Sequence, residues 1–73
     1  MPRKKARDLE RTYSRGQFIT KLRRLADALE TRQPFTIQVA GERLHVPAAA
    51  HFNIEHERGA GANELEFQLR WKE

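Results

Sequence analysis

The sequence predicts an α+β domain: an antiparallel sheet of four to five strands with one amphipathic helix packed on one face, in the order β-α-β-β-β-β. Two periodic segments lead to this class. Residues 64–72, ELEFQLRWK, strictly alternate polar and apolar side chains, which is typical of a half-buried strand. Residues 18–29 repeat apolar side chains at spacings of three and four, which is typical of a helix lying on a core.

The first expected elements are a short strand and the helix. Alternation before residue 14 predicts a strand whose inward pair is Leu9 and Tyr13. Ser14 is a natural helix N-cap, and Gln17 three residues later completes a capping box, so the helix should begin just after Ser14. Pro34 cannot continue a helix, which places the helix end before it.

Two hairpins are expected after the helix. Residues 35–39 and 42–46 alternate on either side of Ala40-Gly41, a tight-turn signal, and Pro47 ends the second of these strands. Residues 52–56 and 64–71 form the second pair, joined by the glycine-rich loop at 59–63.

We expect the apolar rows of all these elements to meet in one core, because the helix would cover the apolar face of a single sheet and leave the other face in water. The expected core is Leu9, Tyr13, Phe18, Leu22, Leu25, Leu29, Phe35, Ile37, Val39, Leu44, Val46, Phe52, Ile54, Leu65, Phe67 and Leu69, with Trp71 at its edge.

Three stretches carry a family resemblance: Tyr13-Ser14-Arg15 before the helix, LRRLADAL at 22–29, and ELEFQLRWK at 64–72. In this order and spacing they resemble the amphi-Trp domain family of small bacterial and archaeal domains, over residues 9–72. The resemblance implies one domain at 8–73 behind a basic tail at 1–7. It implies a fold and no reaction, so no catalytic residue and no cofactor follow from it.

Charge is distributed unevenly along the 73 residues. Residues 1–32 contain ten Lys/Arg and four Asp/Glu, whereas residues 33–73 contain four and six. Cysteine is absent, so disulfides and thiolate metal sites are excluded. The basic start is not followed by an apolar segment, and no segment reaches transmembrane length. A soluble cytoplasmic protein without a membrane partner is expected.

Catalytic and metal-binding functions find little support. His45, His51 and His56 lack the spacing of a shared metal site, and His56 is expected at the polar end of an apolar row. The sequence contains no nucleophile elbow and no phosphate-binding loop. We therefore expect no enzyme activity, no metal and no cofactor.

The glutamates of the second hairpin have two interpretations. Glu55, Glu57, Glu64 and Glu66 could lie side by side on the wet face and form a docking patch for a basic partner. Alternatively, they form an ordinary solvated face whose register avoids direct pairs, since opposed like charges are destabilising.

Trp71 also has two interpretations. It could close the helix–sheet core, or it could lie exposed beside an edge strand and anchor a partner. We place core packing first, and we expect any partner contact at Trp71 and the edge strands.

Two functions remain. The first is a non-enzymatic protein-interaction or self-association module, with an unknown partner or a second copy. The alternative is weak, sequence-independent nucleic-acid binding through phosphate contacts. The cations expected to make those contacts are Arg3, Lys4, Lys5, Arg7, Lys21 and Arg24.

Overall fold

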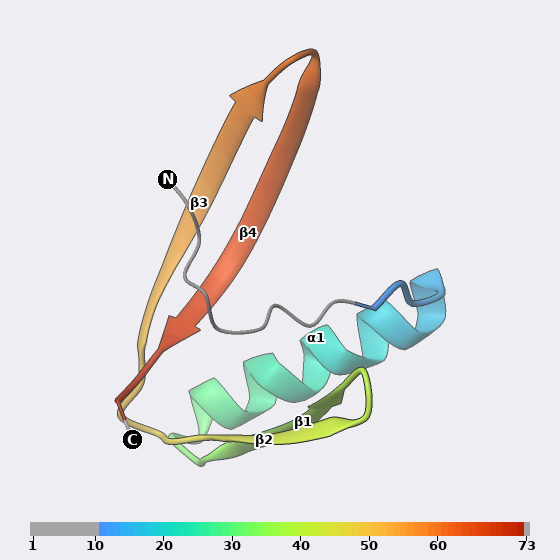
Figure 1. Cartoon of the computed structure of the whole chain (residues 1–73). Coiled ribbons are helices and arrows are strands. Elements are labelled where there is room, and N and C mark those ends of the chain that lie inside the picture. The colour runs from blue at the N-terminus through green and yellow to red at the C-terminus, as the bar shows by residue number, and fades with distance from the viewer. Residues whose placement is uncertain (1–10, 73) are drawn as a thin grey trace.

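The computed structural model describes residues 11–72, which form one helix followed by four strands (Figure 1). The α+β class, the antiparallel pairing and the order of helix and strands are confirmed. Leu9 lies outside the described residues, and residues 11–14 form no strand. The elements are α1 (Arg15–Glu30), β1 (Phe35–Val39), β2 (Glu42–Val46), β3 (His51–Gly59) and β4 (Ala62–Arg70).

The start of α1 is the predicted capping box. The Gln17 backbone N–H donates to Ser14 Oγ at 3.2 Å, and the Ser14 backbone N–H donates to Gln17 Oε1 at 3.1 Å. These two reciprocal hydrogen bonds satisfy backbone donors that no helical carbonyl can reach. Ser14 therefore fixes where the helix begins.

The end of α1 is a Schellman motif formed before Pro34. The N–H of Gln33 donates to the Ala28 carbonyl at 2.9 Å, and the N–H of Arg32 donates to the Leu29 carbonyl at 3.2 Å. This reversal places Arg32 at a φ of 56°, in the left-handed region that glycine adopts without a steric penalty.

Both hairpins turn through two residues with positive φ. The φ values are 50° and 84° at Ala40 and Gly41, and 50° and 77° at Ala60 and Gly61. Two-residue turns of this kind match the right-handed twist of the flanking strands, and glycine suits their second position. The turns therefore set both registers, Phe35 to Val46 and His51 to Arg70.

The four strands form two separate sheets of two strands each, β1 with β2 and β3 with β4. Pro47 follows β2 and has no N–H to extend a ladder. The chain then turns, with the Ala50 N–H donating to the Pro47 carbonyl at 3.1 Å. Figure 1 shows the consequence: the β3–β4 hairpin rises away from α1, β1 and β2 instead of continuing their sheet.

The buried core is small. Among the described residues, only Phe35, Val46 and Ala50 are buried apolar side chains, exposed by 8%, 6% and 8%. They join the first hairpin to the connector that leads into β3. The partly buried residues packed against them are Leu25, Ala28, Ile37, Leu69 and Trp71.

The expectation of one core containing every apolar row is therefore wrong. Phe18, Leu22, Leu29, Phe52, Ile54, Leu65 and Phe67 are all exposed by 40% or more. Part of the reason is the separation of the sheets, which takes the apolar face of β3–β4 away from the helix.

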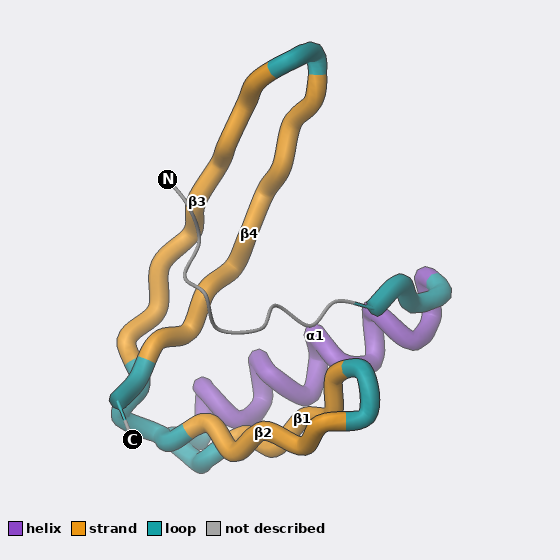
Figure 2. The backbone as a smooth tube through the Cα atoms, in the orientation of Figure 1, coloured by secondary structure: helices purple, strands orange, loops and turns teal. Residues whose placement is uncertain are grey.

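The apolar stripe of α1 is exposed for a second reason, which is the side of the helix that packs against the first hairpin. Arg24 Nη2 donates to the Thr36 carbonyl at 2.6 Å, and the Arg24 guanidinium lies 5.1 Å from the centre of the Phe35 ring. Figure 2 shows α1 lying along β1 and β2, with β3 and β4 rising on its other side. The first hairpin thus contacts the flank of α1 that carries Arg24, Leu25 and Ala28. The apolar stripe that includes Leu22 lies on another side of α1 and stays exposed.

Replacing Arg32 with glycine should stabilise the protein. Arg32→Gly removes the steric cost of the left-handed residue, which is about 1 kcal/mol, partly offset by greater freedom of the unfolded chain. We expect a net gain of a few tenths to about 1 kcal/mol in the free energy of unfolding by denaturant titration. Glu30→Gly is the control and should lose about 1 kcal/mol, because Glu30 is helical. Equal losses in both variants would contradict this account of the helix end.

Candidate interaction surfaces

One face of the β3–β4 hairpin is a continuous apolar row. The register places Phe52 opposite Leu69, Ile54 opposite Phe67 and His56 opposite Leu65. Directly opposed residues share a face of an antiparallel ladder, so these side chains project together. Phe52, Ile54, Leu65 and Phe67 are exposed by 61–66%.

The apolar stripe of α1 is the second uncovered surface. Phe18, Ile19, Leu22 and Leu29 are exposed by 56%, 40%, 43% and 40%. They recur at helical spacing, so they line one side of α1. The periodicity of the sequence correctly predicted both apolar rows, but the prediction that they lie in the core is wrong.

The two surfaces meet in a hollow that we call the apolar notch, with a volume of about 420 Å³. Its helix side is Leu25 and Leu29, and its hairpin side is Phe52, Ile54, Phe67 and Leu69, with Asn53 and Gln68 completing the lining. The helix stripe and the hairpin row together contain eight large apolar side chains that are about half exposed. Together they present about 800 Å² of surface, more than the largest apolar patch of a typical monomer.

The opposite face of the hairpin is acidic at its centre. Glu55 lies opposite Glu66, and Glu57 lies opposite Glu64. The register therefore makes the direct like-charge pairs that a solvated face was expected to avoid. Gln68 Nε2 donates to Glu66 Oε1 at 2.9 Å, which stabilises that carboxylate.

Trp71 follows the last residue of β4. It is partly buried and packs against the core of Phe35, Val46 and Ala50, near the Pro47 connector. This position agrees with core packing as its first role. A hollow formed with Pro47, Ala49 and His51 leaves part of the indole accessible.

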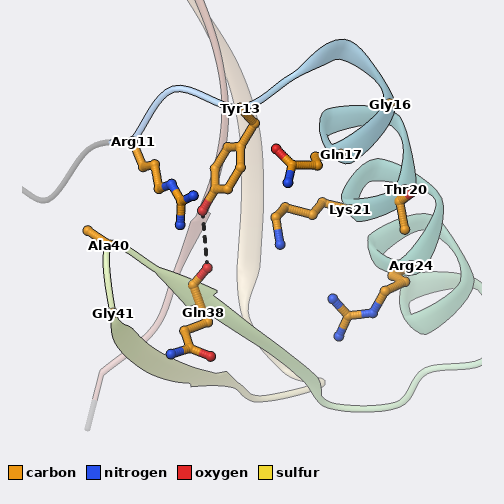
Figure 3. A pocket seen from close by; sticks show the side chains of 10 residues that line it. All are labelled: Arg11, Tyr13, Gly16, Gln17, Thr20, Lys21, Arg24, Gln38, Ala40 and Gly41. Carbon is orange, nitrogen blue, oxygen red and sulfur yellow. Dashed lines mark hydrogen bonds between the residues drawn. The ribbon is translucent and has the colours of Figure 1, made fainter.

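A second kind of surface, which we call the cationic depression, lies between the start of α1 and the β1–β2 turn (Figure 3). Tyr13 stands at its centre and donates from Oη to the Gln38 carbonyl at 3.2 Å. The Arg11 guanidinium and the Lys21 ammonium lie 5.1 Å and 5.0 Å from the centre of the Tyr13 ring. These are cation–π distances, so the ring helps to hold two like charges close together.

The lining of the cationic depression contains Arg24 as a third cation and, among the described residues, no carboxylate. Its volume is about 710 Å³. The structure thus brings Lys21 and Arg24 together with Arg11, which sequence reasoning missed. Arg3, Lys4, Lys5 and Arg7 lie outside the described residues.

The histidines do not converge. His45 Nδ1 lies 3.1 Å from Thr36 Oγ1 across the first hairpin, and His56 Nε2 lies 2.8 Å from Asn63 Oδ1 near the tip of the second. His56 thus ends the apolar row, as predicted. Within residues 11–72 no three His, Asp or Glu side chains are grouped so as to hold a metal ion. In that part of the chain, no helix combines the length and hydropathy needed to cross a membrane.

The fold and its surfaces define a small α+β domain with amphipathic strands, one amphipathic helix and a tryptophan just after the last strand. The chain belongs to the Amphi-Trp domain family, whose model matches residues 1–73. No curated protein and no solved structure matches it. The family match establishes membership and assigns no activity.

Relieving one like-charge pair should stabilise the second hairpin. Glu55→Lys places a cation opposite Glu66, and an opposite-charge pair contributes up to about 1 kcal/mol over a like-charge pair. Amide hydrogen exchange in β3 and β4 should slow at low salt, and the gain should shrink as salt is added. Asn53→Lys is the control: it faces neutral Gln68, loses the Asn53 Nδ2 hydrogen bond to Gln68 Oε1, and should not slow the exchange. An equal change in both variants would mean that the opposed carboxylates cost nothing.

Proposed function

We propose that this protein is a non-enzymatic interaction module that associates with a protein surface through its apolar notch and the adjoining helix stripe. The observation that carries the proposal is the exposure of eight large apolar side chains beside a buried core of three residues. Exposed apolar surface on this scale is characteristic of sites that another protein covers.

The low stability expected of the second hairpin on its own supports the same proposal. An isolated two-stranded hairpin is at best marginally stable in water and needs a further layer on its apolar face. Within residues 11–72, β3 and β4 pair only with each other. A protein partner on the apolar row would supply that layer and would be held by large apolar anchors such as Phe52 and Phe67.

Trp71 and the glutamates have subordinate roles in this proposal. Trp71 packs on the core, so it positions the base of the second hairpin more than it anchors a partner. Glu55, Glu57 and Glu66 lie on the face away from the apolar row. They would keep that face in water and favour partners whose nearby charge is positive.

Site-specific photo-crosslinking tests the proposal directly. A photoreactive phenylalanine analogue at Phe52 should form protein adducts in cells that express the protein, because this position would lie against a partner. The same analogue at Glu55, on the opposite face and outside the notch lining, is the control and should form few. Mass spectrometry of the adducts identifies the partner. Equal adduct yields from the two positions, or no adducts from either, would contradict the proposal.

Nucleic-acid binding is the second candidate, and the cationic depression is the observation that favours it. Arg11, Lys21 and Arg24 surround a hollow that lacks a carboxylate among its described lining residues. Phosphate groups are attracted to such a cluster without base recognition. Two features weaken this candidate: Arg24 already bonds the Thr36 carbonyl, and the strand aromatics lie away from the depression.

Salt dependence tests this second candidate. On addition of a short DNA duplex or a single-stranded RNA, backbone amide signals of residues 11–24 should shift at low salt and return as salt rises. Lys21→Gln should weaken the interaction by a few fold, and Lys72→Gln, distant from the depression, should leave it unchanged. Shifts on β3 and β4 that persist at high salt would contradict phosphate contacts.

A further inference from the structure

We infer that the apolar surface is covered by a second copy of this chain, in a two-fold dimer in which the β3–β4 hairpin of each copy lies on the α1 stripe of the other. This inference rests on the proposed function and names its partner. The structure shows two exposed apolar surfaces on one chain, an α-helical stripe and a two-stranded row, and each is the kind of surface on which the other packs.

The dimensions of the two surfaces match. The α1 helix has 16 residues and is about 24 Å long, and the strands of the hairpin have nine residues and are about 30 Å long. An apolar stripe on a helix and an apolar row on a two-stranded sheet are the two halves of a helix-on-sheet layer. Each copy contributes one of each, so a two-fold contact completes two such layers.

The open shape of the chain favours a second copy over closure of the hairpin onto its own helix. The radius of gyration is 13.6 Å, against about 11 Å for a compact chain of this length. The hairpin rises from the connector and diverges from α1 toward its tip (Figure 1). Leu65 near that tip therefore lies beyond the notch and is available to the other copy.

The area is sufficient for a stable dimer. The eight exposed apolar side chains present about 800 Å² on each copy, which is the area per partner of a standard stable interface. Full use of this surface requires both the stripe and the row, so a contact through one of them alone would leave about half of it uncovered.

Net charge favours the reciprocal arrangement among the symmetric alternatives through long-range attraction, because the hairpin glutamates lie on the face away from the apolar row. Residues 11–32 contain six Lys/Arg and two Asp/Glu. Residues 51–70 contain two Lys/Arg and four Asp/Glu. Helix against hairpin therefore joins opposite net charges. Helix against helix or hairpin against hairpin would join like net charges, which electrostatic complementarity disfavours.

A complementation experiment on the full chain tests the arrangement. Sedimentation velocity over a range of concentrations should show a monomer–dimer equilibrium. Leu22→Glu on the stripe and Ile54→Lys on the row should each raise the dimer dissociation constant by about tenfold or more, because each places a charge in an apolar contact. Thr20→Glu and Glu57→Lys place the same charged side chains on other faces, outside the notch, and should change the dissociation constant little.

Mixing the two interface variants gives the decisive measurement. In the mixed dimer one helix–hairpin contact is intact, and both substitutions fall in the other contact, where their opposite charges face each other. Native mass spectrometry should therefore show mixed dimers in excess over either variant's own dimers. Such recovery also shows that both variants are folded, and circular dichroism of each variant alone provides the control.

Three results would overturn the inference, and they separate it from the proposed function. Dissociation by both variants without recovery on mixing would mean that like surfaces meet. A chain that stays monomeric while Phe52 crosslinks to a different protein would leave the interaction module intact with another partner. A monomer without adducts from Phe52 would remove both proposals.

Discussion

The cluster of Phe35, Val46 and Ala50 is the contact on which the rest of the structure depends. Phe35 and Val46 are the first pair of the first hairpin, and Ala50 precedes β3 directly. Leu25 of the helix and Leu69 of the last strand pack against the same cluster. It therefore joins the helix and both hairpins at one point, and little else among the described residues holds the second hairpin in place.

This dependence has an energetic consequence. Three buried side chains with five partly buried neighbours provide little hydrophobic stabilisation for a chain of this length, where even a complete core is marginal. Eight other large apolar side chains, whose burial would add most to stability, lie outside the cluster and are exposed by 40% or more. Folding and association are thus linked, because any surface that covers them also stabilises the folded chain by mass action.

Local features of the fold were predictable from the sequence, whereas the assembly of the elements was not. Capping at Ser14 and the turns at Gly41 and Gly61 depend on residues close together in the chain, so short-range rules suffice. Periodicity identified the apolar row through Leu65 and Phe67, but it indicates only which side chains share a face. It does not say whether that face meets the same chain, another chain or water.

The connector between the hairpins carries a sequence signal for a break in the sheet. Pro47 cannot extend a ladder, and the three alanines after it add little apolar volume, so residues 47–50 are poorly suited to continue one sheet. Once the second hairpin is separate, its apolar row has no cover within the described residues. The same alternation that predicts a strand then predicts an exposed apolar surface. Whether the row is core or exposed surface depends on whether the connector at residues 47–50 lets the two hairpins join in one sheet.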